Sequence, residues 1–373
     1  MDKIKILYIH HAGCLAGAPK SLSYIIKGLD RTKFNPYLLN IEPGPVDQFF
    51  SKLPVEILSE KGIRPFHGST VVEKSFKLFL RNWIFLVPSI FKAYKFIKKL
   101  DVKLIHLNST CLFAFAIAAK MNKVKVISHV REPLRNGIWG APLRFFCNRY
   151  VDGYIAICEN DLDSLKIPNS KRIKKEVIYN FVDLSKTVVN RDVLRDELNL
   201  NKDDIIFLYL ARFSKSNGWK ELIRTIEKHI TEQHNFHFVF VGANDELQLS
   251  NTTARNIHLI PFREDVEDVL CSSDVFICPF IEPHFARGVI EASAHGLPVL
   301  GSNIGGVNEL IRNDETGYLY NSEDELINKI NLLGNNIVLR KCLGAKGVLY
   351  AKENFDLEKN LNLTYNFYNE ILK

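Results

Sequence analysis

Two short apolar runs flank a helix-length segment in DVFICPFIEPHFARGVIEASAHGLPVLGS, from Asp274 to Ser302. The runs DVFICP and PVLGS are continuous rather than alternating, which is typical of strands buried on both faces of a parallel sheet. The segment between them begins as a loop at Phe285 to Gly288 and continues as a helix. This order predicts a βαβ unit and therefore a parallel sheet.

The same pattern recurs in both directions from this unit. The C-terminal half adds three runs, at 205–211, 237–242 and 256–260, and the N-terminal half has six, at 4–10, 36–41, 103–108, 124–130, 153–158 and 175–180. A polar, charged stretch from Leu184 to Asp204 separates the two sets. Two α/β domains of ordinary size are expected for 373 residues.

These runs predict two Rossmann-like domains with parallel sheets. The first domain is expected at residues 1–183 and the second at 184–355, followed by a helix at 356–373 that could return to the first domain. Two such domains in series predict a cleft between them as the ligand site, with ligands at the carboxyl ends of strands and phosphates near helix N-termini.

Composition is that of an ordinary globular protein, with 46% apolar and 24% charged residues and no low-complexity tract. The seven cysteines are scattered, odd in number and nowhere spaced as CxxC, which argues against zinc and against a disulfide framework. The N-terminus MDKIKILYIHH enters a strand-like run directly, without the pattern of a signal peptide. A cytoplasmic location is therefore expected.

The formal charge of +7 has a local source in KLFLRNWIFLVPSIFKAYKFIKKL, from Lys77 to Leu100. Its uninterrupted apolar part, Trp83 to Val87, is far too short to span a membrane. One interpretation is a domain helix with an apolar face on the sheet and solvated lysines. The other is a helix that contacts an anionic membrane surface, at the inner face of the membrane. A nucleic-acid partner is not expected, because no recognised binding motif accompanies the charge.

Two loops at strand ends are candidates for anion binding. HHAGCLAGAPKSL, from His10 to Leu22, is a small-residue loop that leads into a helix, although it is not GxGxxG and suits close packing equally well. In YLARFSKSNGWKELIRTI, Arg212 lies just past a strand and Gly218 opens an amphipathic helix. An arginine there could meet a phosphate, or it could simply be solvated.

Together with the loop from Cys278 to Ile311, these segments resemble the retaining GT-B glycosyltransferases of the group-one, family-four-like type. The likeness covers nearly the whole chain, including VIYNFVD at Val177 to Asp183 and ETGYLY at Glu315 to Tyr320. It implies two Rossmann-like domains whose sheets face a central cleft. The N-terminal domain would bind the acceptor and the C-terminal domain the nucleotide-sugar donor.

Several donor-site roles are implied by the resemblance. Arg212 matches the family's diphosphate-binding arginine, and Glu291 matches the glutamate that hydrogen-bonds the donor ribose. The loop that opens the next helix would hold the leaving phosphate and sugar hydroxyls through its amides. That loop consists of Phe285, Ala286, Arg287 and Gly288. Glu309 corresponds to the acidic residue after the family's paired glycines.

The N-terminal half supplies two further matches. His129, at the end of VKVISH, matches the histidine that family members present to the sugar near the reacting carbon. Gly17 and Ala18 correspond to the glycine loop that approaches the donor phosphates and the acceptor.

The chain departs from the family pattern at three places. Asn217 stands where a lysine usually supports the diphosphate, so Lys215 or Arg287 would have to compensate. Glu282 precedes Glu291 by nine positions rather than eight, as though His284 were inserted. Ala286 replaces a glycine, which disfavours positive φ there. Glu282 is expected near the sugar if the loop bulges.

The implied reaction transfers a sugar from a nucleotide diphosphate to a hydroxyl of a glycan or lipid-linked saccharide, in cell-surface polysaccharide or lipopolysaccharide biosynthesis. No cofactor or metal is expected, because the DLD at Asp161 to Asp163 falls on what is predicted to be a solvated helix face. Two alternatives remain. One is another GT-B enzyme, such as a sugar-nucleotide epimerase or a phosphorylase. The other is a non-catalytic sugar-nucleotide-binding subunit, for which Asn217 and the altered acidic loop are the motivation.

Overall fold

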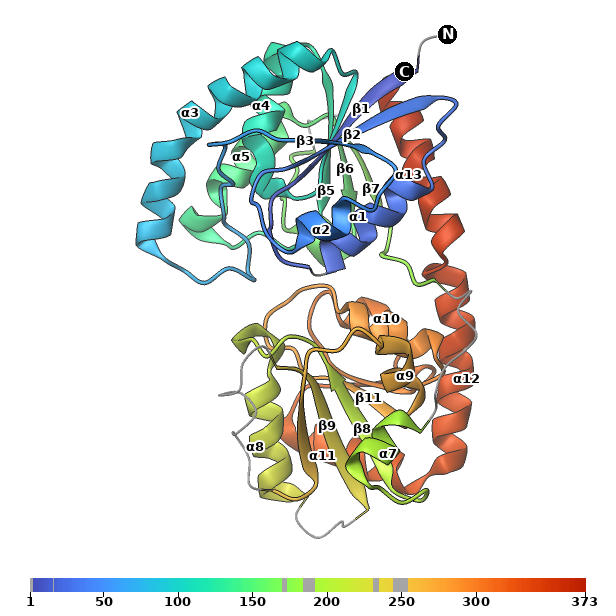
Figure 1. Ribbon diagram of the computed structural model, residues 1–373. Coiled ribbons are helices and arrows are strands. Elements are labelled where there is room, and N and C mark those ends of the chain that lie inside the picture. The colour runs from blue at the N-terminus through green and yellow to red at the C-terminus, as the bar shows by residue number, and fades with distance from the viewer. Residues whose placement is uncertain (1–2, 16, 170–172, 184–191, 231–234, 244–253) are drawn as a thin grey trace. The chain divides into compact units, whose positions relative to one another are not determined.

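The computed structural model describes residues 3–15, 17–169, 173–183, 192–230, 235–243 and 254–373. The chain divides into two compact units (Figure 1). The N-terminal unit comprises residues 1–180 and 358–373, and the C-terminal unit comprises residues 181–357.

The N-terminal unit is built on a sheet of seven parallel strands in the order β3-β2-β1-β4-β5-β6-β7. The strand order reverses between β1 and β4, which makes this pair a topological switch point. The strands are β1 (Ile4–His10), β2 (Phe34–Asn40), β3 (Glu56–Leu58), β4 (Leu104–Leu107), β5 (Lys125–Val130), β6 (Gly153–Ala156) and β7 (Lys174–Val177).

Helices cover this sheet (Figure 1). They are α1 (Gly17–Lys27), α2 (Val46–Phe50), α3 (Phe76–Leu100), α4 (Phe113–Met121), α5 (Ala141–Tyr150), α6 (Glu159–Asp163) and α13 (Leu357–Leu372), with short 3₁₀ turns η1 (Thr110–Leu112) and η2 (Gly137–Trp139). The helix α4 is apolar almost throughout, and most of its side chains are buried in the core between the sheet and the helices α3 and α5.

The C-terminal unit has six parallel strands in the order β10-β9-β8-β11-β12-β13, with its switch point between β8 and β11. The strands are β8 (Ile205–Leu210), β9 (Phe236–Ala243), β10 (Ile257–Pro261), β11 (Val275–Cys278), β12 (Val299–Ser302) and β13 (Gly317–Tyr320). The helices are α7 (Val193–Leu198), α8 (Trp219–His229), α9 (Val266–Cys271), α10 (Arg287–Ala294), α11 (Glu323–Asn335) and α12 (Ile337–Asn354), with 3₁₀ turns η3 (Lys215–Asn217) and η5 (Asn308–Leu310).

The predicted α/β class and the two parallel sheets are confirmed. Each predicted strand lies within three residues of the observed bounds at either end. Two strands were missed. The strand β3 is a three-residue edge strand without buried side chains, and β13 is short, so neither shows a clear apolar run.

The helix α3 has three distinct stripes along its length. A stripe at four- and three-residue spacing is buried, and it consists of Asn82, Leu86, Ser89, Ala93 and Ile97. Apolar side chains of a second stripe are exposed, and lysines and an arginine form the third. The helix thus packs one face on the domain and exposes its lysines, as the first interpretation expects, and contact with a membrane stays a prediction. None of the described helices is long and apolar enough to cross a membrane.

The helix α13 packs on the N-terminal unit, although the whole C-terminal unit precedes it in the sequence (red in Figure 1). The Asn360 amide donates to the Tyr179 carbonyl at 3.0 Å, and the Tyr365 hydroxyl donates to the Ile25 carbonyl at 2.9 Å. These contacts tie the last helix to α1 and to the segment that follows β7.

Candidate functional site

A buried polar cluster lies at the switch point of the N-terminal sheet. His10 ends β1 and Asn108 follows β4, so the two side chains emerge from adjacent parallel strands. The Asn108 amide donates to His10 Nδ1 at 2.9 Å and also to the Ala18 carbonyl at 3.4 Å. The beginning of α1, with Gly17 and Ala18, is thereby held against the strand ends.

Arg131, just past β5, ties this cluster together. Its side chain is buried, and Nε donates to Asn108 Oδ1 at 2.7 Å. One terminal nitrogen donates to Asn180 Oδ1 at 3.2 Å, and the Ser21 hydroxyl donates to the same oxygen at 3.0 Å. The Arg131 guanidinium thus connects the end of β5 with Asn108 after β4 and with Asn180. Asn180 in turn is bonded to Ser21 of α1.

His129 lies in this cluster and is 4% exposed. Its Nδ1 lies 3.3 Å from a terminal nitrogen of Arg131 and 3.3 Å from Nε2 of His106. Its Nε2 is buried and has no hydrogen-bond partner among the described residues. Burial, then the charge of Arg131 and the nearby His106, hold the pKa of His129 well below its usual range. The imidazole is therefore neutral at physiological pH.

The neighbouring histidines are neutral for the same reason. Burial lowers the pKa of His106 to about 3, and the charge of Arg131 acts in the same direction. Burial also lowers the pKa of His10 to about 3, with His11 and Arg131 contributing. Arg131 is therefore surrounded by neutral rings, each of which offers one donor and one acceptor nitrogen.

In the C-terminal unit, Arg212 follows β8 at the switch point and its side chain is exposed. Its backbone is firmly held. The Tyr209 hydroxyl and the Asn217 amide both donate to the Arg212 carbonyl, each at 2.9 Å, and Phe213 stacks on Trp219 with ring centroids 4.6 Å apart. These contacts therefore fix the backbone of Arg212, while its guanidinium is exposed to solvent.

Asn217, where the resemblance predicts a lysine, belongs to this scaffold. The residue is buried and its amide is bonded to the carbonyl of Arg212. Lys215, two residues earlier in η3, is exposed. Compared with a lysine, Asn217 lacks a positive charge, but its amide holds the backbone of Arg212 in place. We call this hydrogen bond from Asn217 to the Arg212 carbonyl the clamp on Arg212.

The loop after β11 is bound to the turn that carries Arg212. The Ser216 carbonyl accepts from the backbone amides of Ile281 at 3.0 Å and Glu282 at 3.2 Å. Gly218 has a φ of 68°, and a Cβ there would lie 1.9 Å from the Pro279 carbonyl oxygen. Only glycine allows this close approach. Arg212 and Glu282 therefore come from two loops that are fastened to each other.

The extra residue of this loop, His284, has a defined place. Its ring stacks on Phe280 with centroids 4.3 Å apart, and its Nδ1 donates to the Glu282 carbonyl at 2.8 Å. Burial lowers the pKa of His284 to about 4; the hydrogen bond to the Glu282 carbonyl opposes this, and the charge of Arg212 adds to it. Gly306, with a φ of 83°, makes room for the bulge, since a Cβ there would lie 2.5 Å from the His284 carbonyl carbon.

The residues after this bulge enter α10. Ala286 has a φ of −96°, so the lost glycine causes no backbone conflict. Phe285 and Ala286 are buried, and a Cβ on Gly288 would lie 2.7 Å from the Phe276 ring, which brings the start of α10 close to the sheet. The backbone at this helix start therefore lies close to the ends of β8 and β11.

Arg287 and Glu291 form an ion pair on consecutive turns of α10, with Nε 2.8 Å from Oε1. Arg287 also donates to the Phe181 carbonyl at 3.2 Å. In this structure Arg287 is engaged with Glu291 and with the Phe181 carbonyl. Glu309 lies in η5, where its carbonyl accepts from the Tyr350 hydroxyl at 3.1 Å. The ligand roles of Glu291, Glu282 and Glu309 stay predictions.

The predicted solvated DLD face is wrong for its first residue. Asp161, in α6, is fully buried, whereas Asp163 is exposed. Within the described ranges there is no group of three or more His, Cys, Asp or Glu that could hold a metal ion. All seven cysteines are free.

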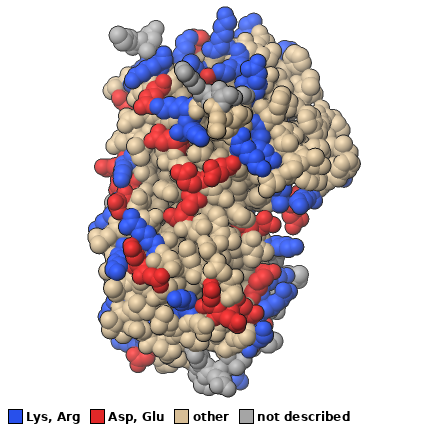
Figure 2. Space-filling view, turned by 180° about the vertical axis from the view of Figure 1, so that it is seen from behind, with Lys and Arg blue, Asp and Glu red and all other residues tan. Residues whose placement is uncertain are grey.

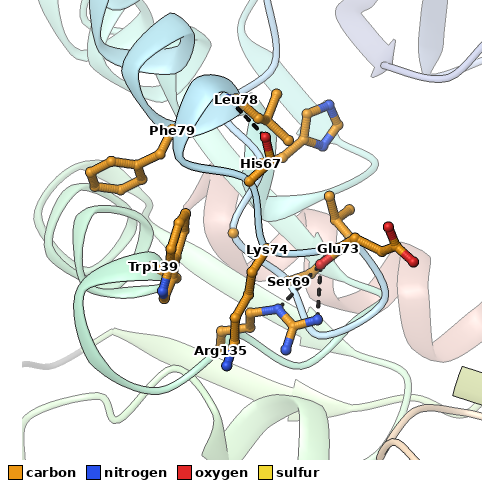
Figure 3. Close-up of a pocket in the computed structure, with 11 residues that line it drawn as sticks. His67, Ser69, Glu73, Lys74, Leu78, Phe79, Arg135 and Trp139 are labelled. Carbon is orange, nitrogen blue, oxygen red and sulfur yellow. Dashed lines mark hydrogen bonds between the residues drawn. The ribbon is translucent and has the colours of Figure 1, made fainter.

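A small pocket in the N-terminal unit lies beside the start of α3 (Figure 3). His67, Lys74, Phe79, Arg135 and Trp139 are among its lining residues. Its volume is about 10 Å³, which is space for a water molecule rather than a sugar. The Arg135 guanidinium is engaged by the Val72 carbonyl, at 2.9 Å from one terminal nitrogen, so the pocket is a packing feature of this segment.

Sequence reasoning missed most of the cluster around His129. Five members were not singled out as site residues: His106, Asn108, Arg131, Asn180 and Tyr368. Four of these lie in or next to strands quoted as apolar runs, and polar residues at the ends of parallel strands could have identified them. Tyr368 gives no such indication, because it is one of several aromatic residues on a terminal helix.

Two family models match this chain, one in each half. Residues 190–347 match the family described as glycosyl transferases group 1, and residues 17–186 match glycosyltransferase family 4. The chain belongs to the group 1 glycosyltransferases. Its two parallel α/β sheets have the GT-B fold.

Three relatives illustrate the likeness. The UDP-Gal:alpha-D-GlcNAc-diphosphoundecaprenol alpha-1,3-galactosyltransferase of Escherichia coli is 25% identical over 91% of this chain and 90% of its own length. The capsular polysaccharide biosynthesis glycosyltransferase CapM of Staphylococcus aureus is 24% identical over 59% of this chain and 62% of its own. The crystal structure of HepE from Anabaena with UDP superposes with a TM-score of 0.80 at 18% identity, covering 98% of this chain and 100% of that one.

The clamp on Arg212 makes a prediction about stability. Replacing Asn217 with alanine in this glycosyltransferase removes the buried donor to the Arg212 carbonyl. We expect the free energy of unfolding of the C-terminal unit to fall by about 1–3 kcal/mol. Urea titration measures this by fluorescence in a background with Trp83→Phe and Trp139→Phe, because Trp219 is then the sole tryptophan of the chain.

The matched control is Asn335→Ala on α11. Asn335 is exposed and its amide also donates to a backbone carbonyl, that of Asn331, at 2.9 Å. Its loss should change the unfolding free energy by at most about 0.5 kcal/mol. Equal effects of the two substitutions would contradict the clamp.

Proposed function

We propose that this glycosyltransferase takes a sugar from a nucleoside diphosphate bound to the C-terminal unit and attaches it to an acceptor hydroxyl, with retention of anomeric configuration. The observation that carries the proposal is the exposed guanidinium of Arg212, fixed at the switch point of the second sheet. A planar cation at the carboxyl ends of parallel strands suits a diphosphate.

The surroundings of Arg212 support a nucleotide donor. Lys215 lies exposed on the same turn, and the first amides of α10 lie close to the ends of β8 and β11. Glu291 on that helix can accept hydrogen bonds from ribose hydroxyls once its ion pair with Arg287 is broken. Two relatives support a uridine diphosphate donor in particular, since one is named for UDP-Gal and another was crystallised with UDP.

The reaction breaks the bond between the anomeric carbon and the diphosphate oxygen and forms a bond from that carbon to the acceptor oxygen. Negative charge develops on the departing diphosphate, and its oxygen takes up the proton that the acceptor hydroxyl loses. Arg212 therefore stabilises the transition state more than the ground state. His129 would contact the transferred sugar with its buried, unpartnered Nε2.

The acceptor proposed is a glycan or a lipid-linked saccharide in cell-surface polysaccharide biosynthesis. The names of the relatives support this class, because one acts on a diphosphoundecaprenol-linked sugar and another belongs to capsular polysaccharide biosynthesis.

The donor site is tested with Arg212→Ala. Purified protein is screened by thermal shift against UDP, GDP, ADP and CMP sugars, because a ligand raises the melting temperature by mass action. We expect one nucleotide class to stabilise the protein, and Arg212→Ala to weaken that binding about ten- to hundredfold through loss of charge-assisted hydrogen bonds.

The control for this test is Arg224→Ala on α8. Arg224 is also an exposed arginine of the C-terminal unit, so the substitution makes the same change in charge. It should leave nucleotide binding unchanged. If both variants lose binding equally, the effect is one of net charge and the donor site lies elsewhere. Binding without transfer or hydrolysis would favour the non-catalytic subunit.

The chemistry of transfer makes a separate prediction. With the donor identified, we expect transfer to continue in EDTA, because the arginine and helix amides supply the charge stabilisation. We also expect the product to keep the donor's anomeric configuration. Product formation by mass spectrometry and the anomeric proton coupling in NMR measure both. Loss of transfer in EDTA that is restored by a divalent cation would refute metal independence.

We further propose that α3 lies on an anionic membrane surface. Its exposed apolar stripe recurs at helical spacing and consists of Phe76, Leu80, Ile84, Val87 and Phe91. Beside it runs a stripe of exposed cations, consisting of Lys77, Arg81, Lys92, Lys95 and Lys99, and the helix contains no acidic residue. Figure 2 shows Lys and Arg gathered over the N-terminal unit, at the top of that view. This combination is typical of a helix in a membrane interface.

Vesicle flotation tests this surface. The wild-type protein should float with vesicles of phosphatidylglycerol and phosphatidylcholine but not with phosphatidylcholine alone. The double variant Ile84→Glu and Phe91→Glu should lose most of this binding. The control, Val338→Glu with Leu349→Glu, changes two equally exposed apolar residues of α12. Flotation that is equal for both variants, or absent in the wild type, would overturn the membrane proposal.

A further inference from the structure

The nitrogen of His129 that carries the proton can be assigned from its neighbours. Arg131 is a donor only, because a guanidinium in a protein does not lose its proton. Its terminal nitrogen lies 3.3 Å from His129 Nδ1, so that Nδ1 must accept. A neutral imidazole has one N–H, and it therefore lies on Nε2.

The assignment extends outward to the C-terminal helix. Since His129 Nδ1 accepts, the contact with His106 Nε2 at 3.3 Å is favourable only if His106 Nε2 carries the hydrogen. His106 Nδ1 then accepts, and the Tyr368 hydroxyl, 2.7 Å away, donates to it. Burial raises the pKa of Tyr368 well above its usual value, so this hydroxyl keeps its proton.

Two donors thus converge on one lone pair of His129. Both distances to its Nδ1 are 3.3 Å, longer than a typical hydrogen bond, as expected when one acceptor is shared. The opposite tautomer would place an N–H on Nδ1 against the Arg131 guanidinium. That arrangement would leave a donor facing a donor in a buried site.

We propose that Arg131 and the chain from Tyr368 through His106 are positioning residues that hold His129 in its Nε2–H tautomer, so that Nε2 is a hydrogen-bond donor toward a sugar oxygen. The catalytic consequence rests on the proposed transfer. In this tautomer Nε2 has no free lone pair, so His129 binds and orients an oxygen and does not abstract the acceptor proton. Tyr368 on the terminal helix, 262 residues after His106 in the sequence, thereby helps to determine which nitrogen of His129 carries the proton.

The tautomer is tested on the full chain labelled with ¹⁵N-histidine. His129 and His106 signals are assigned by their absence in His129→Gln and His106→Gln. In the wild type, both residues should show a protonated, pyrrole-type Nε2 and a bare, pyridine-type Nδ1. A protonated Nδ1 on His129 would overturn the proposal whatever the activity of the protein.

The matched pair Tyr368→Phe and Tyr365→Phe tests the outer end of the chain. Both residues lie on α13 and each loses one hydroxyl, but Tyr365 donates to the Ile25 carbonyl instead of a histidine. Tyr368→Phe should move His106 toward a mixture of tautomers. It should also lower kcat about three- to tenfold with KM little changed, as expected for loss of one hydrogen bond.

Tyr365→Phe should change neither the tautomers nor kcat. Equal results for the two variants would overturn the role of Tyr368. The variant His129→Gln, whose amide can donate from the position of Nε2, should retain more transfer than His129→Ala; equal rates would count against a donor role. If the wild type transfers no sugar from any donor, the proposed function fails, while the nitrogen signals still decide the tautomer.

Discussion

The buried guanidinium of Arg131 sets the arrangement of the N-terminal site. A charge removed from water is tolerated only when its donors meet acceptors, and this one meets Asn108, Asn180 and His129. Each of these acceptors is neutral and each comes from a different part of the chain. The requirement to satisfy one cation therefore fixes side chains at the ends of β4 and β5 and at residue 180 relative to one another.

Each unit has an arginine near the switch point of its sheet, but the two arginines differ in burial. Both units place their polar residues where the strand order reverses, because that is where loops diverge and leave room beside the sheet. The N-terminal unit buries the guanidinium of Arg131, and His129 Nε2, like His10 Nε2 and His11 Nδ1, is buried without a hydrogen-bond partner among the described residues. In the C-terminal unit, Arg212 keeps its guanidinium exposed while Tyr209 and Asn217 hold its carbonyl. A buried cation organises neighbours, whereas an exposed one on a rigid backbone is available to a ligand.

The sequence was sufficient to predict the sheets, because continuous apolar runs that alternate with helix-length segments are rare outside parallel α/β folds. It was also sufficient to identify Arg212 and the acidic loop as lying at strand ends. It failed where a role depends on a distant partner. Asn217 looked like a missing charge, and only the fold shows that its amide clamps Arg212. Asp161 looked solvated by its position in a polar pentapeptide, yet it is buried. Such outcomes depend on packing from residues far away in the chain, which no local pattern records.

The position of α13 shows why the most distant partner could not be predicted. Residues 181–357 form a complete α/β unit that is inserted, in sequence terms, between the body of the N-terminal unit and its last helix. Closing so long a loop costs only slightly more entropy than closing a short one, since the cost grows with the logarithm of length. Burial of Phe367, Tyr368 and Ile371, with the hydrogen bonds of Tyr365 and Asn360, opposes that cost. The N-terminal site is therefore complete only when the sixteen-residue helix α13 has docked, so its histidine chemistry depends on residues that follow the entire C-terminal unit in the sequence.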